Sequence, residues 1–460
     1  MKNVKEILEE EKKRWPMQHF RLQIMREQVF YTCKITLWWM FVAIMIGLAV
    51  GIFSSAFAFC LQKVTACRTA HPQVLYLLPL GGLIIVFLYR RLGFMKDPGT
   101  DILLVAVRDE HKVVPPLMAP LIFVATIITH FCGGSAGREG AALQMGGSIG
   151  NTIGRIFHIK EKDRKVFVMS GMSAAFSAVF GTPMAAAIFP MEMISVGVMH
   201  YAALVPCVLS SLVANMFAIN MGINPEAFHL TDIPVFGPVS GLKILLLGVC
   251  CAVLSVIFCT VLHSIGAIYN HFFRNPYVKV IVGGILVIIV TNIIGSMDYN
   301  GAGTNLIERA IDGQVPYYAW AIKIILTGLT LTAGFKGGEI VPAFTTGATF
   351  GYAFGCLTGI SPSLCAGVGM ISVFCGVTNC PIASMLIGFE LFGFAGVKYL
   401  LLAISISYML SGYHGLYSEQ IIMHSKFHTK YRYRFSRDDS YSSPDYDPSE
   451  FTGSAYEDHK

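Results

Sequence analysis

The chain has 460 residues, of which 54% are hydrophobic and only 13% are charged, and its mean hydropathy is +0.60. This composition excludes a soluble globular protein, because apolar runs long enough to cross a bilayer recur along the sequence. The net charge of +6 is too small to indicate a protein that binds nucleic acid.

Residues 1–36 are predicted to form an amphipathic arm on the cytoplasmic face of a membrane. The segment VKEILEEEKKRW has apolar residues at helical spacing and Glu and Lys residues one turn apart. The first residues are charged, so we expect no cleavable signal peptide. Lys and Arg residues precede the first apolar run and follow the last, which predicts that both termini are cytoplasmic.

Residues 37–424 are predicted to form a membrane domain. Its apolar runs are 37–61, 74–88, 117–131, 244–262, 278–294 and 397–410. These runs are continuously apolar rather than alternating, so they predict an all-α polytopic membrane protein and not a β-barrel. Lys243 and Lys323 lie near the ends of such runs, where a lysine can extend to the membrane interface. The Ser-, Asp- and Tyr-rich tail, 425–460, is predicted to be disordered and cytoplasmic.

Two glycine clusters interrupt the apolar sequence, and each contains a basic residue and a glutamate. They are GGSAGREGA around Glu139 and GFKGGEIVPA around Glu339, one in each half of the membrane domain. Each opens a small-residue helix, as expected for paired inverted repeats with a site between them. Lys336 also offers a simple structural explanation for Glu339, namely a salt bridge.

The start of a helix that follows such a cluster is a site for an anion, because its first backbone N–H groups have no partner. Glu139 is itself an anion at this position. It can occupy the site, or take up a proton and move away, so that one side chain serves as gate and proton carrier. A third interruption, KDPGTDILL, places the hydroxyl of Thr100 before a short helix that Asp101 is expected to cap, although an ordinary turn explains it equally well.

Five motifs in order resemble those of the CLC family of chloride channels and anion/proton antiporters. GREGA is similar to the family's GREGP, GGEIVP to GGxFxP, and GTDIL stands where GSGIP is usual. SGMSAAFSAVFGTPMAAAIFPMEM resembles the small-residue stretch that ends in glutamate, and GLYSEQ resembles the last-helix motif that carries a pore tyrosine. The chain is most similar to the fluoride/proton antiporter branch. The resemblance implies two inverted halves of tilted, re-entrant helices, a homodimer and a location in the cell membrane.

The resemblance also implies roles for individual residues. Glu139 corresponds to the gating glutamate, and Glu339 replaces a proton-transfer group that many antiporters carry where this chain has Met193. The implied anion ligands are two hydroxyl groups and several backbone amides, those of Thr100, Tyr417, Arg138, Glu139, Gly140, Glu339 and Ile340. Glu192 and Glu390 are interpreted as structural carboxylates, and Phe344 is expected to belong to a packed core.

The expected function is therefore transport of chloride or fluoride, in exchange for protons and without a cofactor or metal. A passive chloride channel of the same fold remains an alternative, since Met193 cannot carry a proton. An intramembrane enzyme that uses Glu139 or Glu339 with His130 is a remote alternative, because no zinc-protease or Ser–His pattern occurs at the clusters.

Overall fold

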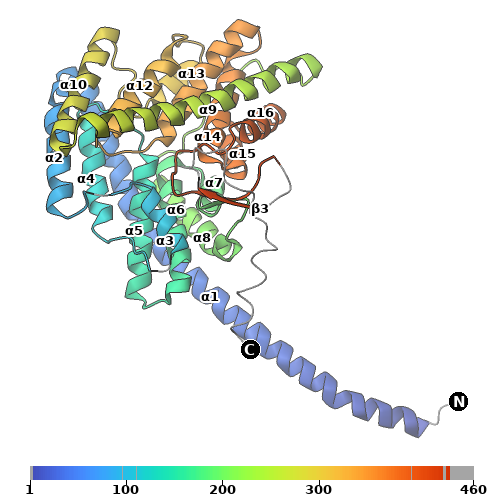
Figure 1. Ribbon diagram of the computed structural model, residues 1–460. Coiled ribbons are helices and arrows are strands. Elements are labelled where there is room, and N and C mark those ends of the chain that lie inside the picture. Colours follow the sequence, from blue (N-terminus) through green and yellow to red (C-terminus); the bar gives the residue numbers. More distant parts are fainter. Residues whose placement is uncertain (1–3, 96, 110, 395, 428–430, 436–460) are drawn as a thin grey trace.

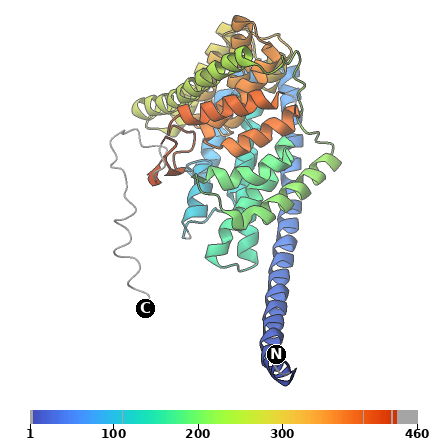
Figure 2. The same ribbon diagram turned by 90° about the vertical axis from the view of Figure 1, so that its right-hand side faces the viewer.

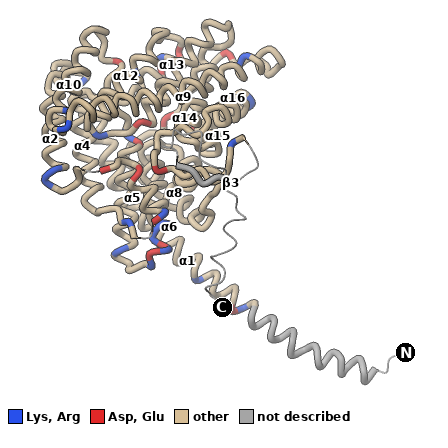
Figure 3. The backbone as a smooth tube through the Cα atoms, in the orientation of Figure 1, with Lys and Arg blue, Asp and Glu red and all other residues tan. Residues whose placement is uncertain are grey.

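The computed structural model describes the chain except residues 1–3, 96, 110, 395, 428–430 and 436–460, and describes 4–24 and 431–435 by their backbone alone. The predicted tail therefore lies largely outside the described residues. Figure 1 shows a body of packed helices from which the long first helix extends toward the N-terminus, and Figure 2 shows that helix running along one side of the body. Figure 3 shows that most of the body carries no charged residue.

The described residues form sixteen α-helices, two short 3-10 helices and three short strands. In chain order they are α1 (Val4–Ala70), η1 (Pro72–Leu77), α2 (Leu78–Arg91), α3 (Asp101–Arg108), α4 (Met118–Phe131), α5 (Glu139–Ile156), α6 (Glu161–Phe180), α7 (Pro183–Met193), β1 (Ser195–Val196), η2 (Tyr201–Ala203), α8 (Leu204–Asn220), α9 (Pro238–Phe272), α10 (Pro276–Ile294), α11 (Thr304–Ile311), α12 (Ala319–Leu331), α13 (Ile340–Thr358), α14 (Pro362–Thr378), α15 (Pro381–Phe392), α16 (Val397–Leu410), β2 (Ile421–His424) and β3 (Tyr431–Phe435).

Six segments of the described chain are long and apolar enough to cross a bilayer. They are Met25–Ala70, Pro72–Arg91, Tyr201–Asn220, Pro238–Phe272, Pro276–Ile294 and Ile340–Thr358. The last of these is mostly buried inside the protein, so its apolar surface packs on other helices rather than on lipid. The predicted polytopic helical fold is confirmed, and each of the six predicted apolar runs lies within or overlaps a helix.

Two helix pairs of similar construction form the centre of the body, α5 with α6 and α13 with α14. Glycines bring their backbones into direct contact. A Cβ placed on Gly146 would lie 2.1 Å from the carbonyl oxygen of Gly171, and one placed on Gly347 would lie 2.4 Å from that of Gly369. No larger residue fits at either crossing, so the same glycine-to-backbone packing occurs once in each half of the chain.

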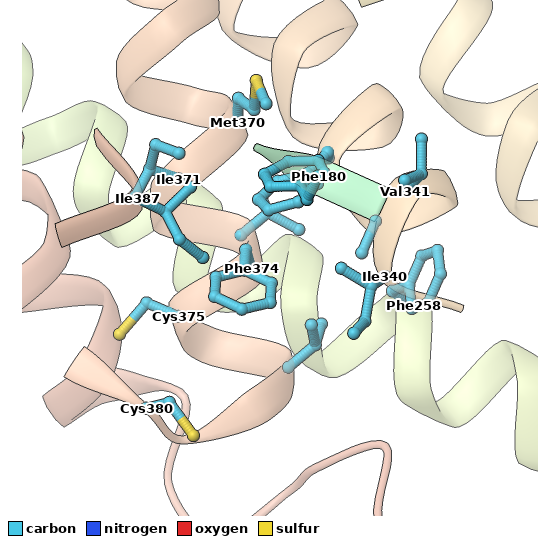
Figure 4. Close-up of a cluster of buried hydrophobic side chains, with 14 of the residues drawn as sticks. Phe180, Phe258, Ile340, Val341, Met370, Ile371, Phe374, Cys375, Cys380 and Ile387 are labelled. Carbon is cyan, nitrogen blue, oxygen red and sulfur yellow. The ribbon is translucent and has the colours of Figure 1, made fainter. Parts of the chain in front are cut away.

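Buried aromatic side chains fill the space between these pairs. The ring of Phe344 on α13 stacks on Phe180 of α6 at 5.6 Å and on Phe374 of α14 at 4.7 Å between ring centroids. Figure 4 shows Phe180 and Phe374 in this cluster together with Ile340 and Val341 at the start of α13. Phe344 is fully buried, as expected for a packed core residue.

A small sheet attaches the C-terminal segment to the body. β2 pairs in parallel with β1, directly after α7, and antiparallel with β3. The buried side chain of Gln420 precedes β2 and donates to the carbonyl oxygens of Met193 and Thr378, at 2.9 Å each. These bonds join the C-terminal segment to the ends of α7 and α14, and they thereby fix the position of the residues just before Gln420.

Candidate anion pathway

The two glycine clusters meet in space. The backbone N–H of Gly137 donates to the carbonyl of Gly338 at 2.7 Å, and the N–H of Gly338 donates to the carbonyl of Gly137 at 2.8 Å. A Cβ placed on Gly338 would lie 2.5 Å from the nitrogen of Gly140, so only glycine allows this approach. The bridge brings the first turns of α5 and α13 together, because each helix begins two residues after its bridging glycine.

Both helix starts present backbone N–H groups without partners inside their helix. The first intrahelical bond of α5 runs from Ala142 to the carbonyl of Arg138, and that of α13 runs from Ala343 to the carbonyl of Glu339. The N–H groups that precede them carry the positive end of each helix dipole. The site therefore offers two positively polarised backbone ends without a metal or a mobile cation.

Glu139 occupies the start of its own helix. Its side chain is fully buried, with 0% exposed, and folds back so that Oε2 lies 3.1 Å from a Cβ placed on Gly137. The carboxylate accepts a hydrogen bond from the backbone N–H of Arg138 at 3.1 Å and one from its Nε at 3.3 Å. The carboxylate is thus held at the positive end of α5, and helix starts of this kind favour negatively charged groups.

Arg138 connects this carboxylate to a second one. Its Nη2 donates to Glu226, which lies in the loop between α8 and α9. One guanidinium therefore binds two carboxylates through different nitrogens, in an ion pair of the kind for which arginine is suited. Sequence reasoning missed Glu226, because it lies 88 residues from Arg138 in a loop with no local motif.

One side of the bridge opens onto a cavity of about 210 Å³, which we call the Glu339 cavity. Its polar lining includes Thr100, Gln144, Glu339 and Tyr417. Gln144 Nε2 donates to the hydroxyl of Thr100 at 3.4 Å, so the proton of that hydroxyl remains available for another acceptor. The hydroxyl oxygen lies 3.5 Å from a Cβ placed on Gly140, beside the start of α5.

Glu339 lines this cavity and forms no salt bridge with Lys336, its neighbour in the sequence. Lys336 Nζ instead pairs with Asp97 at 2.8 Å, so the alternative explanation of Glu339 by a salt bridge with Lys336 is not borne out. Among the described residues, no cation forms a salt bridge with the Glu339 carboxylate. Because Lys336 pairs with Asp97, the carboxylate of Glu339 lies at the cavity without a salt bridge among the described residues.

Contacts between α3 and the C-terminal segment hold Thr100 and Tyr417 on the same cavity. The hydroxyl of Ser418 donates to the carboxylate of Asp101, and Arg108 Nη2 pairs with Glu419 at 2.9 Å. The sequence suggested that Asp101 caps α3, and this is wrong. Its carboxylate instead turns to the C-terminal segment and accepts from Ser418. These contacts join two segments more than 300 residues apart and place two hydroxyl-bearing residues on one wall of the cavity.

The other side of the bridge faces a cavity of about 970 Å³, which we call the Arg68 cavity. Arg138 and His130 line it, and His130 Nε2 lies 3.3 Å from the carbonyl oxygen of Gly137. Lys323 lies behind its wall with 0% of its side chain exposed. The expectation that Lys323 extends to the membrane interface is wrong, since three oxygen acceptors hold its ammonium inside the protein.

The structure brings most of the predicted site residues to one place. Thr100, Glu339 and Tyr417 line the Glu339 cavity, and Gly140 lies beside it. Arg138 lines the opposite cavity, so the Gly137–Gly338 bridge and Glu139 stand between the two. Ile340 differs, because its side chain packs in the apolar cluster and only its backbone belongs to the site (Figure 4). Gln144 was missed, although it lies one turn after Gly140 in the same motif.

Residues 81–412 of the chain match the sequence model of the family described as voltage gated chloride channel. The chain belongs to this family, the CLC proteins. A chloride/fluoride channel protein from Pseudomonas syringae pv. tomato is 32% identical over 396 residues, which cover 85% of this chain and 88% of that protein. A protein named H(+)/Cl(-) exchange transporter ClcA, from Vibrio cholerae, is 25% identical over 55% of this chain and 58% of its own length.

Solved CLC structures agree with this assignment. A CLC-type fluoride/proton antiporter superposes with a TM-score of 0.81 at 30% sequence identity, covering 84% of this chain and 98% of that chain. A slow cyanobacterial Cl−/H+ antiporter superposes with a TM-score of 0.71 at 18% identity, over 81% of this chain and 94% of that chain, which supports the fold alone. The protein is accordingly a CLC-family anion transporter and a multi-pass membrane protein, and not an enzyme.

Proposed function

We propose that this CLC protein exchanges a small halide, fluoride or chloride, for protons, with Glu139 as the gate and proton carrier. The buried carboxylate of Glu139 carries the proposal, since it lies at the start of α5 between two cavities. Held there, it excludes an anion by occupying the positive end of the helix. Once protonated, it loses its attraction to Arg138 and to the helix end, and it can leave the place to a halide.

The proposed central anion site lies at the edge of the Glu339 cavity. Its ligands are the hydroxyl groups of Thr100 and Tyr417, and the backbone amides at the starts of α5 and α13, from Arg138 to Gly140 and at Glu339 and Ile340. The hydrogen bond that Thr100 accepts from Gln144 supports this role, because it leaves the hydroxyl proton free to donate to the ion. Charge-neutral donors of this kind hold a halide without binding it irreversibly.

Glu339 is the proposed second proton group. Its carboxylate faces the cavity and makes no salt bridge among the described residues, so it is available to exchange protons with water there. A proton that reaches Glu139 from this side would pass the same cavity as the anion. This route requires no carboxylate at position 193, where the buried Met193 contributes only its backbone carbonyl to Gln420.

A passive chloride channel of the same fold is the second candidate, and the observation in its favour is Met193. The names of the relatives divide between the two candidates, and both include fluoride. One is named a fluoride/proton antiporter and another a chloride/fluoride channel protein, and each is matched over more than four-fifths of both chains. Fluoride is therefore the first ion to test, with chloride beside it.

We also propose the cell membrane as the location, cytoplasmic termini and a homodimer, all of which rest on family resemblance and on the positive residues beside the first and last apolar runs. The arm 1–36, the membrane domain 37–424 and the tail 425–460 remain the proposed organisation. In the structure α1 runs without interruption from the arm into the body.

Purified protein in liposomes tests the function directly. An outward gradient of fluoride, and separately of chloride, is imposed, and the lumenal pH and the anion are recorded together. An antiporter moves protons against their gradient in fixed proportion to the anion. Anion flux with no proton movement would instead establish the channel, and flux of neither ion would refute both candidates.

A further inference from the structure

Two cations are buried beside the Arg68 cavity without an acidic partner. Arg68, at the end of α1, is 8% exposed and donates from Nη1 to the carbonyl of His130 at 2.7 Å. Lys323 donates to the hydroxyl of Ser135 at 3.0 Å and to the carbonyls of Tyr299 and Gly301 at 3.0 and 2.8 Å. Among the described residues neither forms a salt bridge. Neutral acceptors satisfy some of the N–H groups, but they do not cancel two buried charges.

The two cations are close to each other, because both lie against one short segment, residues 301–303. The guanidinium Nη2 of Arg68 lies 2.7 Å from a Cβ placed on Gly301, and the ammonium of Lys323 lies 3.1 Å from a Cβ placed on Gly303. Ala302 and Gly303, which belong to this segment, line the Arg68 cavity. Two like charges held this close in a mostly apolar body repel each other, and an anion in the cavity would relieve that repulsion.

The acidic groups around this cavity are already committed to other cations. Asp298, which lines it, pairs with Arg309 at 2.7 Å. Arg138, the other arginine of the lining, is neutralised by Glu139 and Glu226. His130 contributes a ring nitrogen that lies against the carbonyl of Gly137. Arg68 is therefore the charged group of the lining for which the described part of the chain provides no opposite charge.

A second positive feature points into the same cavity. α11 begins at Thr304, directly after Gly303, whose φ of 96° is tolerated by glycine. No side chain caps this helix, and its first intrahelical bonds come from Leu306 and Ile307 to the carbonyl of Gly303. The N–H groups of Thr304 and Asn305 therefore lack partners within the helix, and both residues line the cavity.

We propose that a halide ion binds in the Arg68 cavity between the guanidinium of Arg68 and the start of α11, before it reaches Arg138 and the gate. Arg68 supplies the charge and charge-assisted N–H donors, α11 supplies backbone N–H groups, and Lys323 fixes the segment between them. As an entry site for the transported ion it rests on the proposed function, whereas binding of the ion is measurable without transport.

The first test measures halide binding to the detergent-purified full chain by titration calorimetry with sodium fluoride and with sodium chloride. Arg68→Gln is expected to weaken one class of bound halide by about tenfold or more, because a charged donor is lost. Arg91→Gln is the matched control, since this exposed arginine lies outside the described cavities and its loss changes the net charge equally. Arg68→Lys keeps the charge and should restore part of the affinity.

A second variant covers the possibility that Arg68→Gln does not fold. Thr304→Asp adds a carboxylate at the first position of α11, where an acidic residue favours helix formation. This tethered carboxylate would take the place of the ion, so the same class of bound halide should again be weakened. The Thr304→Asn variant has nearly the shape of aspartate without its charge, so it should bind this halide more tightly than Thr304→Asp does.

The outcomes separate the site from the proposed function. Unchanged halide binding in both Arg68→Gln and Thr304→Asp would overturn the site, whatever the liposome experiment shows. A different combination supports the site and refutes the proposed exchange. In it, both variants lose the bound halide in the calorimeter, while the wild-type protein moves neither ion across liposomes.

Discussion

Glu192 and Glu390 each hold the first turn of the other's helix. The carboxylate of Glu192, near the end of α7, accepts the backbone N–H groups of Ile382 and Ala383 at 3.0 and 2.8 Å. The carboxylate of Glu390, near the end of α15, accepts those of Met184 and Ala185 at 2.7 and 2.9 Å. Each end of one helix meets the start of the other, so α7 and α15 run antiparallel, as two inverted repeats require.

Removal of either carboxylate should lower stability without abolishing proton coupling. In Glu192→Ala and Glu390→Ala two helix-start N–H groups lose their acceptor, at a cost of about 1–3 kcal/mol. Thermal unfolding in detergent measures the loss, and the glutamine variants, which keep one carbonyl acceptor, should lose less. If Glu192→Gln were stable but unable to move protons, Glu192 would be a proton donor and the structural interpretation would be wrong.

The gate assignment predicts a clear separation of the two ion fluxes. Glu139→Ala and Glu139→Gln should abolish proton movement and leave passive anion flux, because neither side chain can carry a proton or a charge into the start of α5. Lumenal pH and anion efflux from liposomes are recorded together. Proton pumping at the wild-type rate in Glu139→Ala would remove Glu139 from the mechanism.

Glu339→Gln should slow proton movement more than it weakens anion binding. The substitution keeps the shape of a side chain that faces the cavity and removes only its ability to carry a proton. The exchange ratio in liposomes and the halide affinity in detergent give the two quantities. Asp312→Asn, at an exposed carboxylate, is the control. Exchange in the wild-type ratio would contradict the role of Glu339.

Thr100→Val should weaken anion binding and change the preference among halides. Valine has nearly the same shape but no hydroxyl, and a hydrogen bond to an ion contributes about 1.5–3 kcal/mol, so the half-saturating concentration should rise by roughly tenfold or more. Thr100→Met should change the preference further by filling the space. Unchanged permeability ratios in both variants would place Thr100 away from the ion.

The glycine contacts predict opposite effects for two Gly→Ala substitutions within helices. Gly146→Ala should prevent stable folding, because its Cβ would lie 2.1 Å from a backbone oxygen that cannot move aside. Gly266→Ala in α9 places its Cβ at an ordinary 3.5 Å and should stabilise that helix by about 0.5–1 kcal/mol. Expression and thermal unfolding of both variants decide; equal behaviour would contradict the packing argument.

The sequence predicts the long apolar helices and the two helix starts, because each of these features depends on residues that are neighbours in the chain. The stretches GGSAGREG and GFKGGEIVP contain the glycines, the glutamates and the helices that follow them. The helix α6 carries many small and polar residues that are buried in the body, so its hydropathy does not mark it as a span, whereas α14 is apolar but only 17 residues long. Their burial depends on partners far along the chain, and only the structure reveals those partners.

The pairing of charges was the least predictable part of the site. Sequence proximity suggested Lys336 as the partner of Glu339, whereas the structure pairs Lys336 with Asp97, 239 residues away. Glu226 reaches Arg138 from a loop without regular structure, and Arg68 reaches His130 from the end of α1. Each contact depends on how helices from distant segments pack, which periodicity and local motifs do not encode.

The bridge between Gly137 and Gly338 joins one residue from each half of the chain, so neither half contains the pathway alone. During synthesis the first cluster enters the membrane long before its partner has been made. The start of α5 then lacks the Gly338 backbone that it meets in the complete protein. The paired helix starts therefore come together only after the second half has been made and has packed against the first.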